Sequence, residues 1–322
     1  MDKVELHLHL EGAAPPDFIR RLAAEKRVDL SGIFDADGGY IFRDFAQFLE
    51  TYEAACTVLT TPEDFARLTR AVLEESAAQG VIYTEAFLSP DFCGGGDLGA
   101  WREYLAAIED AAAQAERDLG IAMRGIVTCI RHFGPDRAKA AARCAADTGG
   151  GFVTGFGMAG AEMVGAPRDF GWSFDAAREA GLRLTAHAGE WGGAEMVRAT
   201  LDDLAPERIG HGIGAASDPK LCERLARDGI VLEVCPGSNV VLGAVTSWEA
   251  HPIQTLRERG VKVTISTDDP PFFHTTMGYE YERLADVFGW DDVAFADVNR
   301  VAIDAAFCDD ATKDRVRGRL AG

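Results

Sequence analysis

The stretch Glu5-Leu6-His7-Leu8-His9-Leu10-Glu11-Gly12 (ELHLHLEG, residues 5–12) decides how the rest of the chain is interpreted. Leucines alternate in it with charged residues and histidines, which is the period-two pattern of a β-strand. Residues two apart on a strand share a face, so His7 and His9 point the same way and their ring nitrogens can converge. Two converging imidazoles at the end of a strand suit a divalent transition metal such as zinc.

Seven further strands are predicted downstream, with helices between them. The expected strands span residues 80–88, 122–130, 152–158, 182–188, 208–211, 230–235 and 261–267. The expected helices span 101–119, 135–147, 170–180, 194–204, 218–228 and 252–259, followed by two closing helices at 279–288 and 292–306. Strict alternation implies parallel strands with helical crossovers, and eight such units predict an α/β protein with a closed (β/α)8 TIM barrel. An open doubly wound sheet is the alternative, although no Gly-x-Gly-x-x-Gly follows the first strand.

The region between the first two strands contains no convincing core strand. Pro15-Pro16 opens one helix, residues 45–52 have the apolar spacing of a second, and a third spans 65–79. We therefore expect a helical insertion after strand one, as well as extra C-terminal helices. Because no linker, low-complexity tract or repeat interrupts the chain, we expect a single domain over residues 1–322.

The composition narrows the function. The chain has 322 residues, of which 47% are hydrophobic, enough for a full core, and its net charge of −20 disfavours nucleic-acid or anionic membrane partners. A nucleoside or base without phosphates is not penalised in this way. Seven scattered cysteines without a Cys-x-x-Cys fit a reducing cytosol, and no signal pattern or apolar run of 18 residues is found. We expect a cytoplasmic protein; its oligomeric state stays open.

Metal-ligating residues cluster at the predicted strand ends. The first, fifth, sixth and eighth strands end in His7 and His9, His187, His211 and Asp268, respectively. A single histidine there is more often a hydrogen-bonded core residue than a ligand, but four of the seven histidines fall at one mouth of the predicted barrel. Strand parity turns His187 and Asp268 inward together with His7 and His9. Three neutral imidazoles and one carboxylate, with a position open for water, make a mononuclear catalytic zinc site.

Five segments resemble those of the adenosine/adenine deaminases. They are HLHLEG at 7–12, HAGE at 187–190, RIGHG at 208–212, EVCPGSN at 233–239 and STDDPP at 266–271. The resemblance covers essentially the whole chain, in order. It implies a (β/α)8 barrel with zinc that hydrolyses the exocyclic amine of an adenine ring to a 6-oxopurine and ammonia.

Carried over residue by residue, the resemblance implies one zinc ion per chain, with the ligands His7, His9, His187 and Asp268. It implies that Glu190 protonates the ring nitrogen beside the amine-bearing carbon, because an aromatic ring resists attack until that nitrogen accepts a proton. It implies that His211 orients and helps deprotonate the zinc-bound water, whose pKa zinc lowers to roughly 7.

The resemblance also implies contacts with a small purine nucleoside or base. Asp269 would hydrogen-bond the imidazole part of the purine, and Gly160 would present its backbone to the pyrimidine side. Glu11 would lie at the end of the site that holds the ribose of a nucleoside. The predicted helix at 45–52 resembles the family's hydrophobic lid, although it could simply pack on the barrel; its apolar residues are Phe45, Phe48, Leu49 and Tyr52.

The positions that bear on the substrate disagree. Adenosine deaminases usually have Asp where Glu11 stands and adenine deaminases usually have Glu, whereas Ala159-Gly160 is the nucleoside-type pattern. We expect zinc-bound hydroxide to attack adenosine and deoxyadenosine. Adenosine would give inosine and ammonia. The enzyme would then act in purine salvage and nucleotide metabolism. The alternatives are adenine, giving hypoxanthine, or a modified adenine nucleoside; a noncatalytic metal protein and a phosphoesterase are less favoured. We assign no role to His132 or His251.

Overall fold

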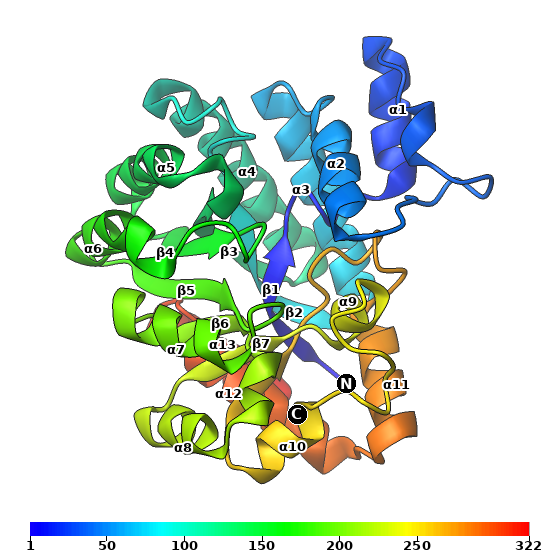
Figure 1. Cartoon of the computed structure of the whole chain (residues 1–322). Helices are drawn as coiled ribbons and strands as arrows, with labels where there is room; N and C mark the ends of the chain where they lie inside the picture. The colour runs from blue at the N-terminus through cyan, green and yellow to red at the C-terminus, as the bar shows by residue number, and fades with distance from the viewer. Residues whose placement is uncertain (322) are drawn as a thin grey trace.

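Eight parallel strands follow one another in chain order in the computed structural model, which describes residues 1–321. They are β1 (Lys3–His9), β2 (Val81–Leu88), β3 (Ala122–Ile130), β4 (Val153–Ala159), β5 (Arg183–Ala188), β6 (Arg208–His211), β7 (Val231–Val234) and β8 (Lys262–Ile265). Helices alternate with the strands and surround them (Figure 1). They are α1 (Pro16–Lys26), α2 (Phe45–Cys56), α3 (Pro62–Ala78), α4 (Leu98–Leu119), α5 (Pro135–Thr148), α6 (Gly171–Glu179), α7 (Gly193–Leu204), α8 (Pro219–Asp228), α9 (Pro236–Val241), α10 (Ile253–Glu258), α11 (Met277–Phe288), α12 (Asp292–Ala305) and α13 (Asp310–Leu320).

The last and first strands meet just beyond the end of β8. The backbone N–H of His9 donates to the carbonyl of Asp268 at 3.0 Å, and the N–H of Asp268 donates to the carbonyl of His7 at 3.1 Å. These two bonds nearly close the sheet into a (β/α)8 barrel, so the predicted fold is confirmed and the open sheet is excluded. The predicted insertion after the first strand consists of α1, α2 and α3.

Two helices were not predicted. The short helix α9 directly follows β7, and α13 makes three closing helices where two were expected. In α13 the buried residues are Thr312 and Val316, so its sequence lacks a strong apolar stripe. The helix is instead started by Asp309, whose side chain accepts a hydrogen bond from the N–H of Thr312.

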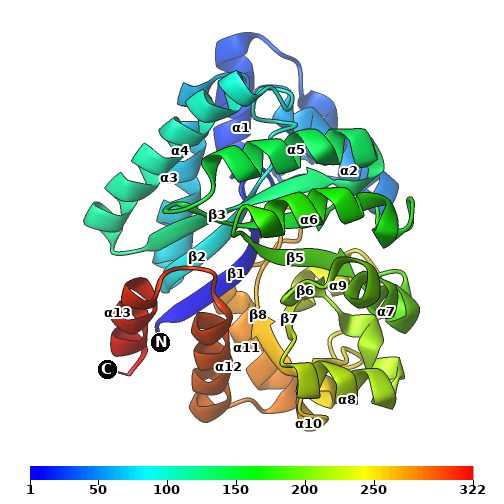
Figure 2. The same ribbon diagram turned by 90° about the vertical axis from the view of Figure 1, so that its left-hand side faces the viewer.

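The helices α12 and α13 cover the amino-terminal end of the barrel. Val316 of α13 packs in one buried cluster with Val4 of β1 and Ile82 of β2. The two ends of the described chain lie close together in both views (Figures 1 and 2), and Arg319 pairs with Asp2 at 3.2 Å. Among residues 1–321, no helix combines the length and apolar character needed to cross a membrane.

A buried ion-pair cluster lies inside the barrel, toward the amino-terminal ends of the strands. Arg208 places its Nε 2.5 Å from Glu233 and its Nη1 2.6 Å from Glu85, and its guanidinium lies 3.6 Å from the ring centre of Phe307. Glu5, also buried, accepts hydrogen bonds from the backbone N–H and hydroxyl of Thr267. These polar side chains occupy the inward face that strand parity predicts, below the carboxyl ends of the strands.

Candidate active site

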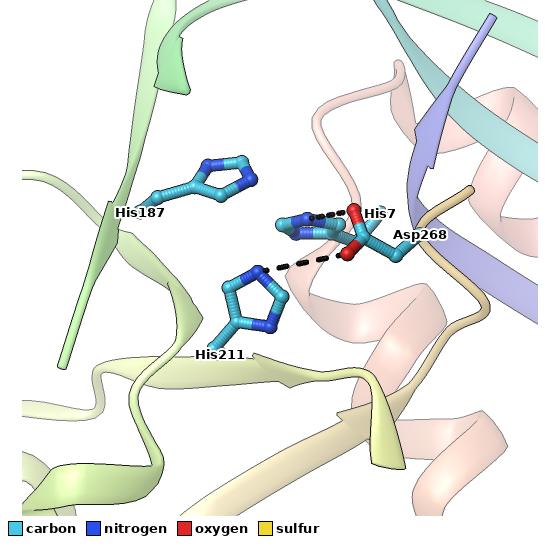
Figure 3. A group of neighbouring side chains, drawn as sticks. All are labelled: His7, His187, His211 and Asp268. Carbon is cyan, nitrogen blue, oxygen red and sulfur yellow. Dashed lines mark ion pairs between the residues drawn. The ribbon is translucent and has the colours of Figure 1, made fainter. Parts of the chain in front are cut away.

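Histidines and an aspartate from distant parts of the chain converge at the mouth of the barrel. Figure 3 shows His7, His187, His211 and Asp268 pointing toward one another. Asp268 Oδ1 lies 3.3 Å from Nε2 of His7 and 3.2 Å from Nε2 of His9. The Nε2 atoms of His9 and His187 are 3.3 Å apart. The structure therefore brings together all four residues that sequence parity turned inward.

This donor set fits a divalent cation. The Nε2 of His7 is buried and has no hydrogen-bond partner, although it faces the Asp268 carboxylate. Burial disfavours the charged ring, but its interactions with the Asp268 and Glu233 carboxylates outweigh it and raise the pKa of His7 to about 9. A site that attracts a proton so strongly at an unpaired nitrogen also suits a cation held by imidazole and carboxylate ligands.

A second layer of polar residues orients this donor set. Glu233 accepts from Nδ1 of His7 at 2.8 Å, so the Nε2 of that ring is turned to the centre. The hydroxyl of Ser238 donates to Asp268 Oδ2 at 2.7 Å, which leaves Oδ1 toward the histidines. Outer partners of this kind fix the orientation of metal ligands.

Two site residues have a strained backbone. His211 has φ 58° and Asp268 has φ 68°, in the left-handed region that residues other than glycine seldom occupy. Such a conformation costs about 1–2 kcal/mol at each position. The Asp268 N–H bond to β1 and the bond from the Gly212 N–H to the Ala188 carbonyl hold the two segments. Strained backbone conformations of this kind are common at functional sites.

Glu190 lies in the loop after β5, beside the histidine cluster. Its side chain is 8% exposed, and Oε2 is 3.7 Å from Nε2 of His211. Burial, followed by the nearby charge of Asp268, raises the pKa of Glu190 well above its usual range. The carboxylate of Glu162 accepts from the backbone N–H groups of the two residues that flank Glu190, Gly189 at 2.5 Å and Trp191 at 2.6 Å. The loop that carries Glu190 is thus held in place by Glu162, and burial favours the protonated form of the Glu190 carboxyl.

A pocket lies over the cluster, between the barrel and α2. It is lined by His9, Phe45, Phe48, Leu49, Tyr52, Glu53, Phe92, Ile130, His132, Ala159, Gly160, His187, Glu190, His211, Leu242, Asp268 and Asp269. All four apolar residues predicted on α2 contribute, as do Gly160 and Asp269. The helix thus covers the pocket. Burial and the charge of Asp268 raise the pKa of Asp269 well above its usual range.

Glu11 is placed differently. It is not among the pocket-lining residues: its buried carboxyl lies beneath Tyr52, 3.4 Å from that hydroxyl and 3.4 Å from the N–H of Ser89. Burial raises the pKa of Glu11 to about 7.

Sequence patterns missed several residues around the site. His132, to which no role was assigned, lines the pocket, accepts from the N–H of Ala161 and lies 3.3 Å from Glu53 of α2. His251 lies behind the cluster, against Asn239. No periodicity marks either position. Asn239 belongs to the EVCPGSN segment, which could have drawn attention to its side chain.

Comparison with known proteins gives a consistent result. The family model described as "Adenosine deaminase" matches residues 2–321. The chain is 47% identical over 320 residues to an adenine deaminase of Rhizobium leguminosarum, covering 99% of both chains. It is 46% identical over 318 residues to an adenine deaminase of Agrobacterium fabrum, covering 99% of this chain and 97% of the relative.

Two solved structures are also similar. The crystal structure of adenine deaminase from Arthrobacter aurescens has 32% identity and a TM-score of 0.91, covering 99% of this chain and 98% of the other. A zinc-bound amidohydrolase from Burkholderia ambifaria has 29% identity and a TM-score of 0.88, covering 100% and 90%.

These relatives correct the expected substrate. The expectation of adenosine and deoxyadenosine is wrong, because relatives with 42–47% identity over 99% of the chain are adenine deaminases. The nucleoside-type Ala159-Gly160 pattern is therefore a weaker indicator of the substrate than Glu11. A physical reason is the position of Glu11, which is turned under Tyr52 and does not line the pocket, where it was expected to meet a ribose.

Proposed function

This chain belongs to the adenosine deaminase family and is a metal-dependent aminohydrolase, and we propose that its substrate is adenine, which it converts with water to hypoxanthine and ammonia. The observation that carries this proposal is the 42–47% identity to adenine deaminases over 99% of the chain. The small pocket under α2, lined largely by aromatic and apolar side chains, supports a small substrate such as a purine base. A role in purine salvage and a cytoplasmic location are parts of the same proposal.

The proposed cofactor is one zinc ion per chain, held by His7, His9, His187 and Asp268. The unpaired Nε2 of His7 and the orientation of the ligands by Glu233 and Ser238 support this assignment. When bound, zinc would supply a Lewis acid that makes a water molecule nucleophilic at neutral pH.

Glu190 is the proposed general acid. Burial raises its pKa and so favours the protonated carboxyl, and the side chain lines the pocket. Transfer of that proton to the ring nitrogen beside the amine-bearing carbon makes this carbon electrophilic. The oxygen of a water molecule then bonds to this carbon; one of its protons restores the acid form of Glu190, and the other passes to the exocyclic nitrogen as the C–N bond breaks, which releases hypoxanthine and ammonia. His211, with Nε2 3.7 Å from Glu190 and 3.9 Å from Asp268 Oδ2, is proposed to orient the attacking water.

The remaining pocket residues are proposed to bind and enclose the purine. Asp269, buried and with a raised pKa, would hydrogen-bond its imidazole part. The backbone at Gly160 has φ 97°, and a Cβ there would lie 2.7 Å from Nδ1 of His132, so the main chain can approach the pyrimidine side closely. The α2 side chains Phe45, Phe48, Leu49 and Tyr52 would cover the ring and exclude water. Glu11 would support Tyr52 from below.

The test compares substrates on one zinc-loaded preparation. Initial rates are measured by ultraviolet absorbance with adenine, adenosine and deoxyadenosine, together with the zinc content per chain. We expect kcat/KM to be highest for adenine, with about one zinc ion per chain. A higher kcat/KM for either nucleoside would refute the proposed substrate. Absence of turnover with all three compounds would refute the proposed function.

A further inference from the structure

The side-chain amide of Asn239 lies between the two residues to which catalytic roles are proposed. Its Nδ2 is 3.2 Å from Oε1 of Glu190 and 3.1 Å from Nδ1 of His211. An amide nitrogen carries two hydrogens, so one group can donate to both partners. Asn239 and His211 are 0% and 1% exposed, which excludes bulk water as a substitute donor.

The direction of these hydrogen bonds is set by His251, which contacts the oxygen of the Asn239 amide. Its Nδ1 accepts from the backbone N–H of Ile253 at 3.2 Å, and its Nε2 lies 3.3 Å from Oδ1 of Asn239. A backbone N–H can only donate, so Nδ1 of His251 has no proton. Burial lowers the pKa of His251 to about 3, and the neutral ring must carry its single proton on Nε2.

This proton fixes the orientation of the Asn239 amide. Nε2–H of His251 needs an acceptor, and the oxygen of Asn239 is that acceptor. The flipped amide would place its NH2 group against the donor of His251 and its oxygen against Glu190. The NH2 group therefore faces Glu190 and His211, and the assignment follows from the backbone donor at Ile253.

A consequence follows for His211. Its Nδ1 accepts from Asn239, so a neutral ring carries its proton on Nε2, which faces Asp268 Oδ2 at 3.9 Å and Glu190 Oε2 at 3.7 Å. In this tautomer His211 presents a donor to the reaction centre. It can orient an attacking oxygen by donating to it, whereas the expected removal of a proton from water would need the opposite tautomer.

We propose that Asn239, anchored by His251, is a positioning residue that holds the Glu190 carboxyl and fixes His211 in the Nε2–H tautomer. The inference rests on the proposed function for the roles of Glu190 and His211, but the hydrogen-bond relay itself does not depend on the substrate. The relay runs from the start of α10 through α9 to the loop after β5 and to the last residue of β6. The relay gives a role to His251, which is buried although it does not lie among the proposed metal ligands.

The test uses zinc-loaded full-length protein with three relay variants and one control. Asn239→Ala removes the bridging donor, and His251→Phe keeps a ring but removes the donor to Asn239. His251→Gln keeps a side-chain NH2 that can donate to Asn239. The control, Asn299→Ala, removes a buried asparagine that accepts from the N–H of Val4 at the opposite end of the barrel.

We expect Asn239→Ala and His251→Phe to lower kcat for adenine about 10- to 100-fold, with little change in KM or zinc content. His251→Gln should regain most of the rate, and Asn299→Ala should keep its kcat per folded molecule. ¹⁵N NMR of histidine-labelled protein should show His211 protonated on Nε2 in the wild type, with a tautomer mixture in Asn239→Ala and His251→Phe. A His211→Gln spectrum identifies the signals.

A wild-type His211 protonated on Nδ1, or wild-type kcat in both Asn239→Ala and His251→Phe, would overturn the inference. Loss of zinc in proportion to the loss of rate would also overturn it, because the relay would then act on metal retention. If adenine is not a substrate but the tautomer shifts as expected, the relay is supported and the substrate assignment fails.

Discussion

Glu233 Oε2 lies 2.8 Å from Nδ1 of His7, across the ring from the Nε2 that faces Asp268. Burial opposes ionisation of Glu233, but the buried guanidinium of Arg208 and the bond to His7 outweigh it and lower the pKa of the carboxyl. A carboxylate at this place keeps the proton of His7 on Nδ1, so Nε2 is free to bind a cation.

We therefore expect Glu233→Gln to weaken metal binding. Glutamine has no charge; its amide oxygen can still accept from Nδ1, but a neutral acceptor holds the ring tautomer less strongly than a carboxylate. The expected fall in zinc affinity is about 10- to 100-fold, measured by competition with a chromogenic chelator. Glu207→Gln is the control, because Glu207 pairs with Arg183 on the exposed side of the barrel end. Equal zinc affinity in Glu233→Gln and wild type would argue against this role of Glu233.

Glu190→Gln should separate catalysis from metal binding. Glutamine has a similar shape and keeps an oxygen that can accept from Asn239, but it has no acidic proton to transfer. We expect kcat with adenine to fall by about 10²- to 10⁴-fold while zinc content stays unchanged. Steady-state kinetics and elemental analysis on the same sample measure both. Full activity with full zinc content would show that another group protonates the ring.

Much of this site could be predicted from the sequence because strand periodicity is a strong local signal. The alternation of Leu6, Leu8 and Leu10 with polar residues fixes the face on which His7 and His9 lie, and the closure of the barrel brings His187 and Asp268 to the same face. The repeated strand–helix units then set the fold. These features depend on short-range patterns that a single sequence contains.

Other contacts could not be predicted because they join irregular segments. His251 meets Asn239 only after α9 and α10 have turned back on the mouth of the barrel, and no periodicity indicates that approach. His132 lies in a 3-10 turn after β3, where a loop position was all that could be inferred. The substrate was mispredicted for a related reason, since the direction of the Glu11 side chain depends on Tyr52 in a separate helix.

The pair formed by Glu53 and His132 joins α2 to the opposite rim of the pocket. Oε1 of Glu53 is 3.3 Å from Nε2 of His132, and the two side chains are 46% and 20% exposed. Because a pair this exposed contributes at most about 1 kcal/mol, we expect Glu53→Ala to raise KM for adenine by about two- to fivefold, with kcat nearly unchanged. Glu50→Ala, exposed on the same helix, is the control and should match wild type. A KM for Glu53→Ala equal to that of Glu50→Ala would mean that the pair does not hold α2 closed.

Glu280 should make stability depend on pH. It is fully buried in α11, accepts from the N–H of Gly237 and the hydroxyl of Thr275, and has no cationic partner among these contacts. Burial raises its pKa from 4.5 to about 8. Between these values the folded state binds a proton that the unfolded state has released, so the free energy of unfolding falls as pH rises, by up to about 1.4 kcal/mol per pH unit.

Glutamine imitates the protonated acid and removes this titration. We expect the free energy of unfolding of Glu280→Gln, measured with urea, to fall less than that of wild type between pH 5 and pH 8, a range that lies between the ordinary pKa of 4.5 and the shifted pKa of about 8. Below pH 4.5 the two proteins should have similar stability. The matched control is Glu282→Gln, exposed on the same helix, which should keep the wild-type pH dependence. If Glu280→Gln and wild type lose stability in parallel as pH rises, Glu280 is already ionised in the folded protein, and a cation that compensates its charge must be sought near Gly237.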